Sequence, residues 1–339
     1  MRNPNFENLL KVLKCEKPDR PTLFEFFLNE RLYKTLAGEA IYAMTDKLAT
    51  YRVLIHSFKN SGYDYATVRG SDFNFPKGER HLGKSISQNE GALIIDRESF
   101  EKYVWPDADA YDYSALLEIK QEIPEGMKLI VFGPGGVLEN VTELIGFENL
   151  CFMIYEDPEL VQKIFDEVGS RLLKYYEICA PFDTVGALIS NDDWGYNSQT
   201  MLKPSDMRKY VFPWHKKIVE AIHALGKPAI LHSCGNLSEV MDDIIDDMKY
   251  DGKHSYQDII IPVEEAYEKW GSRIAILGGI DVNFVCTSSE EDITKRSISM
   301  IQRASSRGGY ALGTGNSVPE YVPDEKYFAM IKAIGVCPL

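Results

Sequence analysis

The chain has 339 residues, of which 45% are hydrophobic and 26% charged, and its formal net charge is −14 at pH 7. This composition is typical of a globular protein with a large core, and the excess of acid disfavours an extended nucleic-acid or anionic-membrane surface. Residues 1–20 interleave charged with apolar positions, so no signal peptide is expected, and no run reaches the roughly 18 apolar residues of a membrane span. We therefore expect a cytoplasmic protein that binds neither nucleic acid nor membrane.

Short apolar or β-branched runs alternate with longer amphipathic stretches along the whole chain. They predict strands over residues 22–27, 63–70, 128–135, 185–195, 227–235, 250–257, 273–281 and 308–316. Strands that alternate with helices form parallel β-α units, and eight such units close most simply into a (β/α)8 TIM barrel. We expect one α/β domain over residues 1–339, with an N-terminal helical extension. An open doubly wound sheet is the alternative, but the G-x-G-x-x-G motif that is usual in dinucleotide-binding sheets is not found after the first strand.

Two helices are predicted from explicit signals. Residues 157–180 begin with Asp157 as N-cap and Pro158, and repeat apolar residues with a period of about 3.6, which indicates a long surface helix. Residues 203–227 contain Pro213, which should kink the second helix before it ends near Gly226. Residues 71–111 are expected to form a long excursion after the second strand, with room for a small hairpin.

Active sites of TIM barrels lie at the carboxyl ends of the strands, so we examined which polar residues fall there. The sequence places a large set at these ends, namely Glu25, Arg69, Asp72, Asn191, Asp192, Asp193, Tyr196, His232, Cys234, His254, Asp281, Thr314 and Asn316. Such an accumulation at one end of the predicted sheet indicates a site of chemistry.

The segment LHSCG, residues 231–235, carries two ligand-type side chains on one face of a strand. Side chains alternate along a strand, so His232 and Cys234 point the same way. Imidazole nitrogen and thiolate sulfur are preferred ligands of zinc, and a catalytic zinc site needs a third protein ligand and one open position. Cys286, in the loop after the seventh strand, is the first candidate for the third ligand, and His254 is the second. A buried His and a buried Cys before a turn remain the alternative explanation.

Two adjacent acids follow the fourth predicted strand, in the segment SNDDWG. Carboxylates are rarely buried without a partner, and successive side chains point apart, so only one acid can face the pocket. We select Asp193 for the pocket and expect Asp192 to cap a helix or pair with a basic residue. The GPGG turn at residues 133–136 either binds an anion through its amides or is glycine-rich because of its turn geometry. The six cysteines are scattered, so no disulfide framework is expected.

As a whole the sequence resembles the uroporphyrinogen decarboxylase superfamily, which contains the decarboxylases and the cobalamin-linked methyltransferases. The resemblance is carried by residues 19–26 (DRPTLFEF), 131–168 (VFGPGG to DEV), 192–195 (DDWG), 231–244 (LHSCGNLSEVMDDI), 273–282 (RIAILGGIDV) and 308–331 (GGYALGTGN to AMI). The decarboxylases carry M-R-Q-A-G-R after an Arg-Pro, with arginines that bind substrate carboxylates. Here Arg20 and Pro21 are followed by TLFEFF, so the resemblance favours the methyltransferase branch.

In that branch the H-x-C motif binds zinc together with the cysteine of a later G-C-G, and Thr314 stands at the position of that cysteine here. The resemblance therefore implies a zinc held by His232, Cys234 and either Cys286 or His254, or a site without metal. The family activity is transfer of a methyl group from a methylated corrinoid to a thiol or similar small acceptor. The chain lacks a D-x-H-x-x-G cobalamin motif, so the corrinoid is expected on a partner protein.

The resemblance also suggests roles for the other residues at the strand ends. We expect Asp193, Tyr196 and Asp281 to orient the ligands or the acceptor. Three further residues are expected to bind substrate: Glu25, Asn191 and Asn316. Related barrels often pair, so a homodimer is expected. The alternative functions are a metal-free decarboxylase or lyase, which would use Asp193 or Asp281 as acid and base, and a binding protein without catalytic activity.

Overall fold

The computed structural model describes residues 2–78 and 91–336, which form an α/β fold on one curled parallel sheet. Within these residues, seven strands are hydrogen-bonded in chain order, each parallel to the next. They are β1 Tyr65–Arg69, β2 Lys128–Phe132, β3 Val185–Asn191, β4 Ala229–His232, β5 Gly252–His254, β6 Ala275–Leu277 and β7 Tyr310–Ala311. Each lies inside a predicted strand segment, so seven of the eight predictions are confirmed and the open doubly wound order is excluded.

The predicted first strand, residues 22–27, is not a strand in the structure. Leu23 forms a single parallel bridge with Leu312, directly after β7. On the other side of the segment, the Thr67 hydroxyl of β1 donates to the carbonyl oxygen of Phe26 over 2.7 Å. The segment therefore lies between the last and first strands of a TIM-like sheet, but a side-chain hydrogen bond takes a carbonyl that a full β-ladder would use. The prediction of a regular strand over residues 22–27 was therefore wrong, because only Leu23 is paired as in a strand.

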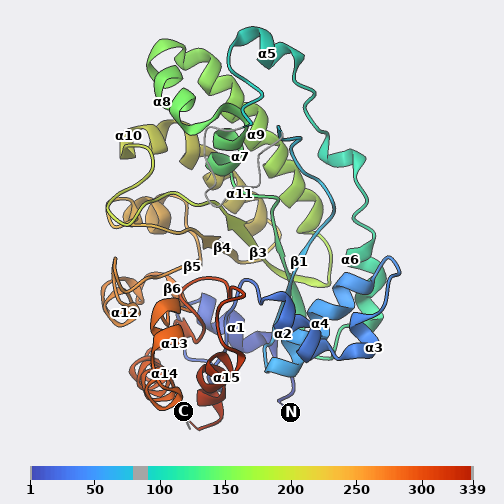
Figure 1. The fold of residues 1–339 in the computed structure, drawn as a ribbon, viewed down its shortest axis with the longest axis vertical. Helices are drawn as coiled ribbons and strands as arrows, with labels where there is room; N and C mark the ends of the chain where they lie inside the picture. The colour runs from blue at the N-terminus through green and yellow to red at the C-terminus, as the bar shows by residue number, and fades with distance from the viewer. Residues whose placement is uncertain (1, 79–90, 337–339) are drawn as a thin grey trace.

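Helices surround the sheet, as Figure 1 shows. The first helix precedes residues 22–27, and three more lie between this segment and β1: α1 Phe6–Leu13, α2 Glu30–Ala37, α3 Glu39–Tyr42 and α4 Ala49–Ser61. Those of the middle of the chain are α5 Arg97–Lys102, α6 Ala115–Glu118, α7 Val137–Ile145, α8 Phe147–Glu156, α9 Pro158–Cys179, α10 Pro204–Asp206 and α11 Phe212–His223. The last are α12 Val263–Trp270, α13 Val282–Thr287, α14 Glu290–Ala304 and α15 Asp324–Lys332. None of the helices in the described ranges is long and apolar enough to cross a bilayer.

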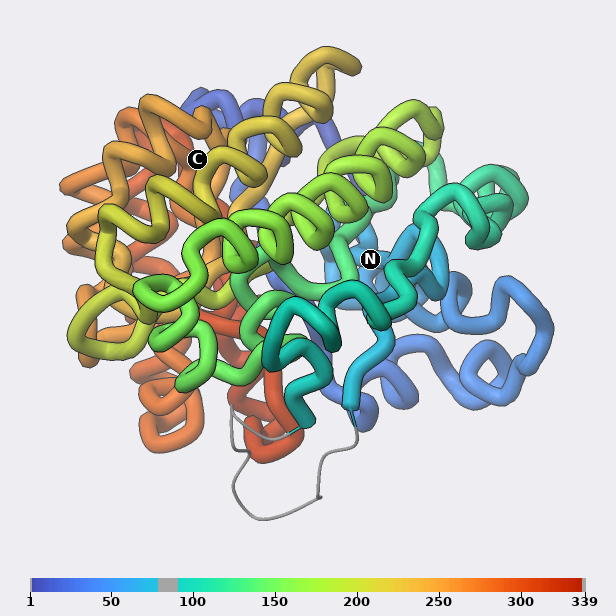
Figure 2. Tube along the Cα trace, turned by 90° about the horizontal axis from the view of Figure 1, so that it is seen from above, coloured from blue at the N-terminus to red at the C-terminus, as the bar shows by residue number. Residues whose placement is uncertain are grey.

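The long predicted helix is confirmed as α9, which crosses the molecule in green in Figure 2. The side chain of Asp157 caps it by accepting a hydrogen bond from the Leu160 amide over 3.1 Å. Its buried face carries Tyr176, whose hydroxyl donates over 2.8 Å to the carbonyl oxygen of Ile189 in β3. This bond fixes α9 against the carboxyl half of β3, just ahead of the predicted site.

The second predicted helix is interrupted near its proline. A π-helical turn, Met207–Val211, precedes α11, and Pro213 is near the start of α11. Proline has no amide hydrogen and cannot continue the preceding hydrogen-bond ladder, so the predicted kink takes the form of this wide turn.

The predicted excursion over residues 71–111 is only partly described. Residues 71–78 and 91–111 contain α5 and a 3-10 turn at Ala108–Ala110, and no strand is found in them. The hairpin foreseen there would involve residues 79–90, which lie outside the described residues.

Candidate functional site

The candidate site is built where β3 and β4 end side by side. The final residues of these strands, Asn191 and His232, are paired in register. Directly afterwards the Asp192 amide donates to the His232 carbonyl oxygen over 2.9 Å. The Cys234 amide then donates to Oδ1 of Asp193 over 2.8 Å. Backbone pairing therefore brings the acids after β3 against the His-x-Cys motif after β4.

Asp193, His232 and Cys234 form a compact group of metal-ligand atoms. Their ligand atoms lie within 4.8 Å of one another, and no other such group of three occurs in residues 2–78 and 91–336. Nε2 of His232 is 3.9 Å from Sγ of Cys234. A tetrahedral zinc ion, with bonds of about 2.3 Å to sulfur and about 2.0 Å to nitrogen, would hold such a pair about 3.6 Å apart. The spacing of His232 and Cys234 is therefore close to that of two ligands on one zinc ion, and Asp193 is near enough to be a third ligand.

The structure places Cys286 outside this group. Cys286 is on α13, where its carbonyl oxygen accepts a hydrogen bond from Nζ of Lys326 over 2.6 Å. The segment after Asp281 is a helix and not the loop assumed from the sequence. Asp281 itself caps that helix, because its carboxylate accepts the Phe284 and Asp258 amides, each over 2.9 Å.

His254 contacts the ring of His232 at Nδ1, the ring nitrogen that is not the one near Cys234. Its Nδ1 lies 2.8 Å from Nδ1 of His232, and its Nε2 lies 3.2 Å from the carbonyl oxygen of Thr314. Burial lowers the pKa of His254 to about 3 and holds the pKa of His232 well below its usual range. Both rings are therefore neutral near pH 7, and both nitrogens of His254 are used inside the protein.

The Cys234 sulfur is surrounded by hydrogen-bond donors. The Ser255 hydroxyl and the side-chain amide of Asn316 each lie 3.4 Å from Sγ. Burial, and next the charge of Asp193, raise the pKa of the Cys234 thiol to about 12. A cation at the group would reverse this preference, and the two donors would then stabilise the thiolate. Asn316, predicted to bind substrate, thus contacts a ligand of the candidate metal site.

Lys253 is a residue near the candidate site that the sequence patterns did not predict. This residue of β5 is 3% exposed, and its Nζ donates over 2.7 Å to the carbonyl oxygen of Ser255. Burial lowers the pKa of Lys253 to about 8. Lys253 therefore fixes the backbone of Ser255, whose hydroxyl faces Cys234. The only signal in the sequence was a lysine inside a predicted buried strand.

Glu25 is fully buried and is bound to Thr314. Oε1 of Glu25 accepts the Thr314 amide over 2.6 Å, and Oε2 lies 2.7 Å from the Thr314 hydroxyl. Burial raises the pKa of Glu25 to about 8. The Thr314 hydroxyl also contacts the carbonyl oxygen of Asn316. Glu25 therefore holds the loop after β7, and the hydroxyl of Thr314 is occupied by these partners.

Asp192 and Asp193 point apart, as the strand alternation predicts. The Asp192 carboxylate is fully buried and accepts the Leu138 and Glu139 amides at the start of α7, each over 2.9 Å. Nε2 of His215 lies 2.9 Å from the same carboxylate. The capping and pairing roles expected for Asp192 are both confirmed.

The GPGG turn is explained by its geometry. The Gly136 amide donates to Oε2 of Glu139 over 2.9 Å, and the next free amides of α7 bind Asp192. Gly135 has φ +90°, and a Cβ on Gly136 would lie 2.0 Å from the Asp192 side chain. With these amides already paired, the structure favours the turn explanation over anion binding.

Two pockets are lined by a residue of the metal-ligand group or by a residue in contact with it. One is lined by Asp193 and Asn191 together with Arg69, Lys77 and Glu139. The other is lined by Asn316, Asp281 and Cys286, with Tyr321 and Ile259 exposed at it. Asp193 of the group lines the first pocket, and Asn316, which contacts Sγ of Cys234, lines the second.

Tyr196 lies nearer the surface than the other predicted site residues. Its side chain is 43% exposed, and its ring meets that of Phe147 edge-on at 6.3 Å between centroids. Its backbone is fixed by hydrogen bonds with Gln199 and Asn236. Tyr196 is not one of the three ligand-type residues that the structure gathers.

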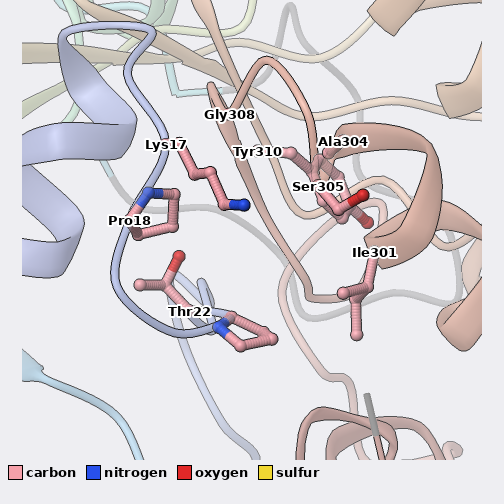
Figure 3. Close-up of a pocket in the computed structure, with 9 residues that line it drawn as sticks. Lys17, Pro18, Thr22, Ile301, Ala304, Ser305, Gly308 and Tyr310 are labelled. Carbon is pink, nitrogen blue, oxygen red and sulfur yellow. The ribbon is translucent and has the colours of Figure 1, made fainter. Parts of the chain in front are cut away.

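A further pocket lies at the opposite, amino end of the sheet. Figure 3 shows its lining, which includes Lys17, Thr22, Gly308 and Tyr310. Gly308 precedes β7, and no His, Cys, Asp or Glu lines this pocket. Among the described residues, the one group of three ligand-type side chains is at the carboxyl end of the sheet, where TIM-like enzymes have their active sites.

The curled parallel sheet, with ligand-type side chains gathered at its carboxyl end, defines a TIM-like α/β enzyme. The chain belongs to the uroporphyrinogen decarboxylase (URO-D) family, whose model matches residues 70–335. It is 25% identical over 272 residues to uroporphyrinogen decarboxylase of Anaeromyxobacter sp. (strain Fw109-5), covering 78% of this chain and 75% of that protein. Identity to uroporphyrinogen decarboxylase of Anaeromyxobacter dehalogenans (strain 2CP-C) is 23%, with the same coverage. A solved methyltransferase from Methanosarcina mazei has the same fold, with a TM-score of 0.68 at 14% identity over 97% of both chains.

Proposed function

We propose that this protein is a zinc-dependent methyltransferase, which moves a methyl group from a methylated corrinoid on a partner protein to a thiol or similar small acceptor. The observation that carries the proposal is the group formed by Asp193, His232 and Cys234, whose ligand atoms lie within 4.8 Å of one another. This donor set suits zinc and leaves one coordination position for an acceptor. The fold shared with the Methanosarcina mazei methyltransferase is compatible with this chemistry.

In this proposal Asp193 takes the place of the cysteine that Thr314 replaces, so neither Cys286 nor His254 is the third ligand. Zinc, when bound, would supply the positive charge that keeps an acceptor thiol deprotonated near neutral pH. The Cys234 amide orients the Asp193 carboxylate from 2.8 Å. Ser255 and Asn316 donate hydrogen bonds to Sγ of Cys234, which would stabilise the thiolate and fix its orientation.

In this proposal each of the two pockets described above would hold one reactant. The pocket with Asp193 and Arg69 would hold the small acceptor beside the metal ligands. The pocket with Asn316 and Asp281 would face the corrinoid of the partner protein, with Asp281 shaping its wall by capping α13. Holding both reactants on either side of one group lowers the barrier by positioning alone. Tyr196 would contact the reactants from the exposed rim.

A metal-free decarboxylase is the second candidate function, and two observations favour it. Both curated relatives described above are uroporphyrinogen decarboxylases, and the pocket beside Asp193 contains the cations Arg69 and Lys77, which suit a carboxylated substrate. The side chain of Lys77 is paired with Glu143, which leaves Arg69 as the main cation toward such a substrate. A carboxylate beside Asp193 would also be repelled by it, which weighs against this candidate.

Elemental analysis of the purified protein tests the proposal. We expect near-stoichiometric zinc in the wild type and in Cys286→Ala, and its loss in Cys234→Ala and Asp193→Ala. Methyl transfer from free methylcobalamin to 2-mercaptoethanol should follow the zinc content in these variants. A zinc-free wild type that decarboxylates a small carboxylic acid, with unchanged rate in Cys234→Ala, would favour the second candidate.

A further inference from the structure

The ring of His232 is held by a second imidazole and not by a carboxylate or a backbone carbonyl. Nδ1 of His232 and Nδ1 of His254 lie 2.8 Å apart, within hydrogen-bond distance. The second ring is completely buried and His232 is 8% exposed, so no water competes for this contact on the His254 side. The contact therefore contains one shared proton, and the question is which ring carries it.

The position of Thr314 answers this question. Its carbonyl oxygen, which can only accept, lies 3.2 Å from Nε2 of His254. His254 must therefore carry its proton on Nε2, and its Nδ1 is then the unprotonated acceptor of a neutral imidazole. The proton between the rings consequently belongs to Nδ1 of His232, which leaves Nε2 of His232 with its lone pair.

That lone pair is on the side of the metal-ligand group. Nε2 of His232 is the ring atom that lies 3.9 Å from Sγ of Cys234. The Thr314 backbone that starts this chain of contacts is itself fixed, because the Glu25 carboxyl group accepts the Thr314 amide over 2.6 Å and lies 2.7 Å from the Thr314 hydroxyl. The order of contacts is Glu25, Thr314, His254 and His232, and all four residues are buried.

We propose that His254 is a positioning residue that fixes His232 in its Nδ1-protonated form and directs the Nε2 lone pair toward Cys234 and Asp193. Its use toward zinc rests on the proposed function, whereas the protonation pattern is a property of the metal-free protein. A histidine that binds a metal through one nitrogen usually donates from the other to a fixed acceptor, and His254 is that acceptor here.

The protonation pattern is tested by long-range ¹H–¹⁵N NMR on metal-free protein labelled at histidine. The chain has six histidines, and the His232→Gln variant assigns the signal of interest. We expect Nδ1 of His232 to be protonated and Nε2 to be unprotonated. A protonated Nε2 in the wild type would overturn the proposal, whether or not the protein binds zinc.

Two substitutions separate positioning from packing. His254→Gln keeps an acceptor for His232 and a donor for Thr314, whereas His254→Leu fills the space and offers neither. We expect zinc affinity, measured by competition with a chromophoric chelator, to fall by about 10- to 100-fold in His254→Leu and to stay close to wild type in His254→Gln. Equal losses in both variants, or none in His254→Leu, would overturn the role. If neither variant folds, the wild-type NMR result decides alone.

These results also distinguish the two proposals. A wild type with the expected protonation pattern but no affinity for zinc would contradict the proposed function and support the assignment of His254. A wild type that binds zinc, but has a protonated Nε2 on His232 in its metal-free state, would support the proposed function and contradict the assignment of His254.

Discussion

The Asp193 carboxylate accepts the backbone amide of Cys234 over 2.8 Å, so the residue after β4 that carries the thiol also orients the acid after β3. The preceding acid, Asp192, faces the other way and caps α7. Two neighbouring carboxylates therefore have separate tasks, one at the candidate metal site and one in the fold. This separation makes them a matched pair for mutagenesis.

Asp193→Asn is expected to reduce zinc affinity by about tenfold or more, because an amide oxygen is a weaker zinc ligand than a carboxylate. The free energy of unfolding of the metal-free protein should change by less than about 1 kcal/mol, because Asp193 is only half-buried. Chelator competition and urea unfolding measure the two quantities. Unchanged zinc affinity would exclude Asp193 as a ligand.

Asp192→Asn is expected to give the opposite pattern. The substitution removes a fully buried charge that faces the Leu138 amide of α7 and the buried ring of His215, so the free energy of unfolding should fall by about 2–4 kcal/mol. Zinc content of the folded fraction should remain as in the wild type. A stable Asp192→Asn protein without zinc would contradict this division of tasks.

Glu25 should make stability depend on pH in the neutral range. Its pKa is raised from 4.5 to about 8 by burial, so the folded protein keeps a proton that the unfolded chain releases. Below pH 4.5 the protonated Glu25 contributes fully to the free energy of unfolding. As the pH rises from 4.5 to about 8, this free energy falls by up to about 1.4 kcal/mol per pH unit, and the loss ends once the pH passes the pKa of Glu25 in the folded protein.

Glu25→Gln should remove this dependence, because glutamine is a neutral mimic of the protonated acid and offers Thr314 an acceptor and a donor. We expect the variant to match the wild type at low pH and to exceed its stability above pH 8. Urea unfolding across this pH range checks both statements. Parallel pH profiles for the two proteins would mean that Glu25 is ionised in the folded state.

Cys234 of the metal-free protein should react slowly with iodoacetamide. Burial raises its pKa to about 12, so the reactive thiolate is scarce, and its rate should keep rising with pH up to that value. Cys286 lies on α13, where burial raises the pKa of its thiol but the nearby charge of Lys326 lowers it, so Cys286 serves as the internal control. Peptide mapping by mass spectrometry at about pH 8 should show Cys286 labelled first. Equal rates would contradict the buried, protonated state of Cys234.

Local patterns in the sequence predicted much of the fold. The alternation of apolar runs with amphipathic stretches placed seven strands, and Asp157 with Pro158 marked the start of α9. The period of two along a strand placed His232 with Cys234 and separated Asp192 from Asp193. These features depend on residues that are close in the chain, so the geometry of a single strand or helix determines them.

Contacts between distant segments decided the rest of the site. The register of β3 on β4 brings Asp193 to Cys234, whereas the capped start of α13 leaves Cys286 outside the group. His254 lies behind His232 because Thr314, sixty positions further along, accepts from its other nitrogen. Periodicity says which way a side chain points, but not which side chain of another strand it meets. That choice follows from strand register and from the need of buried polar groups for partners, and both are properties of the folded chain.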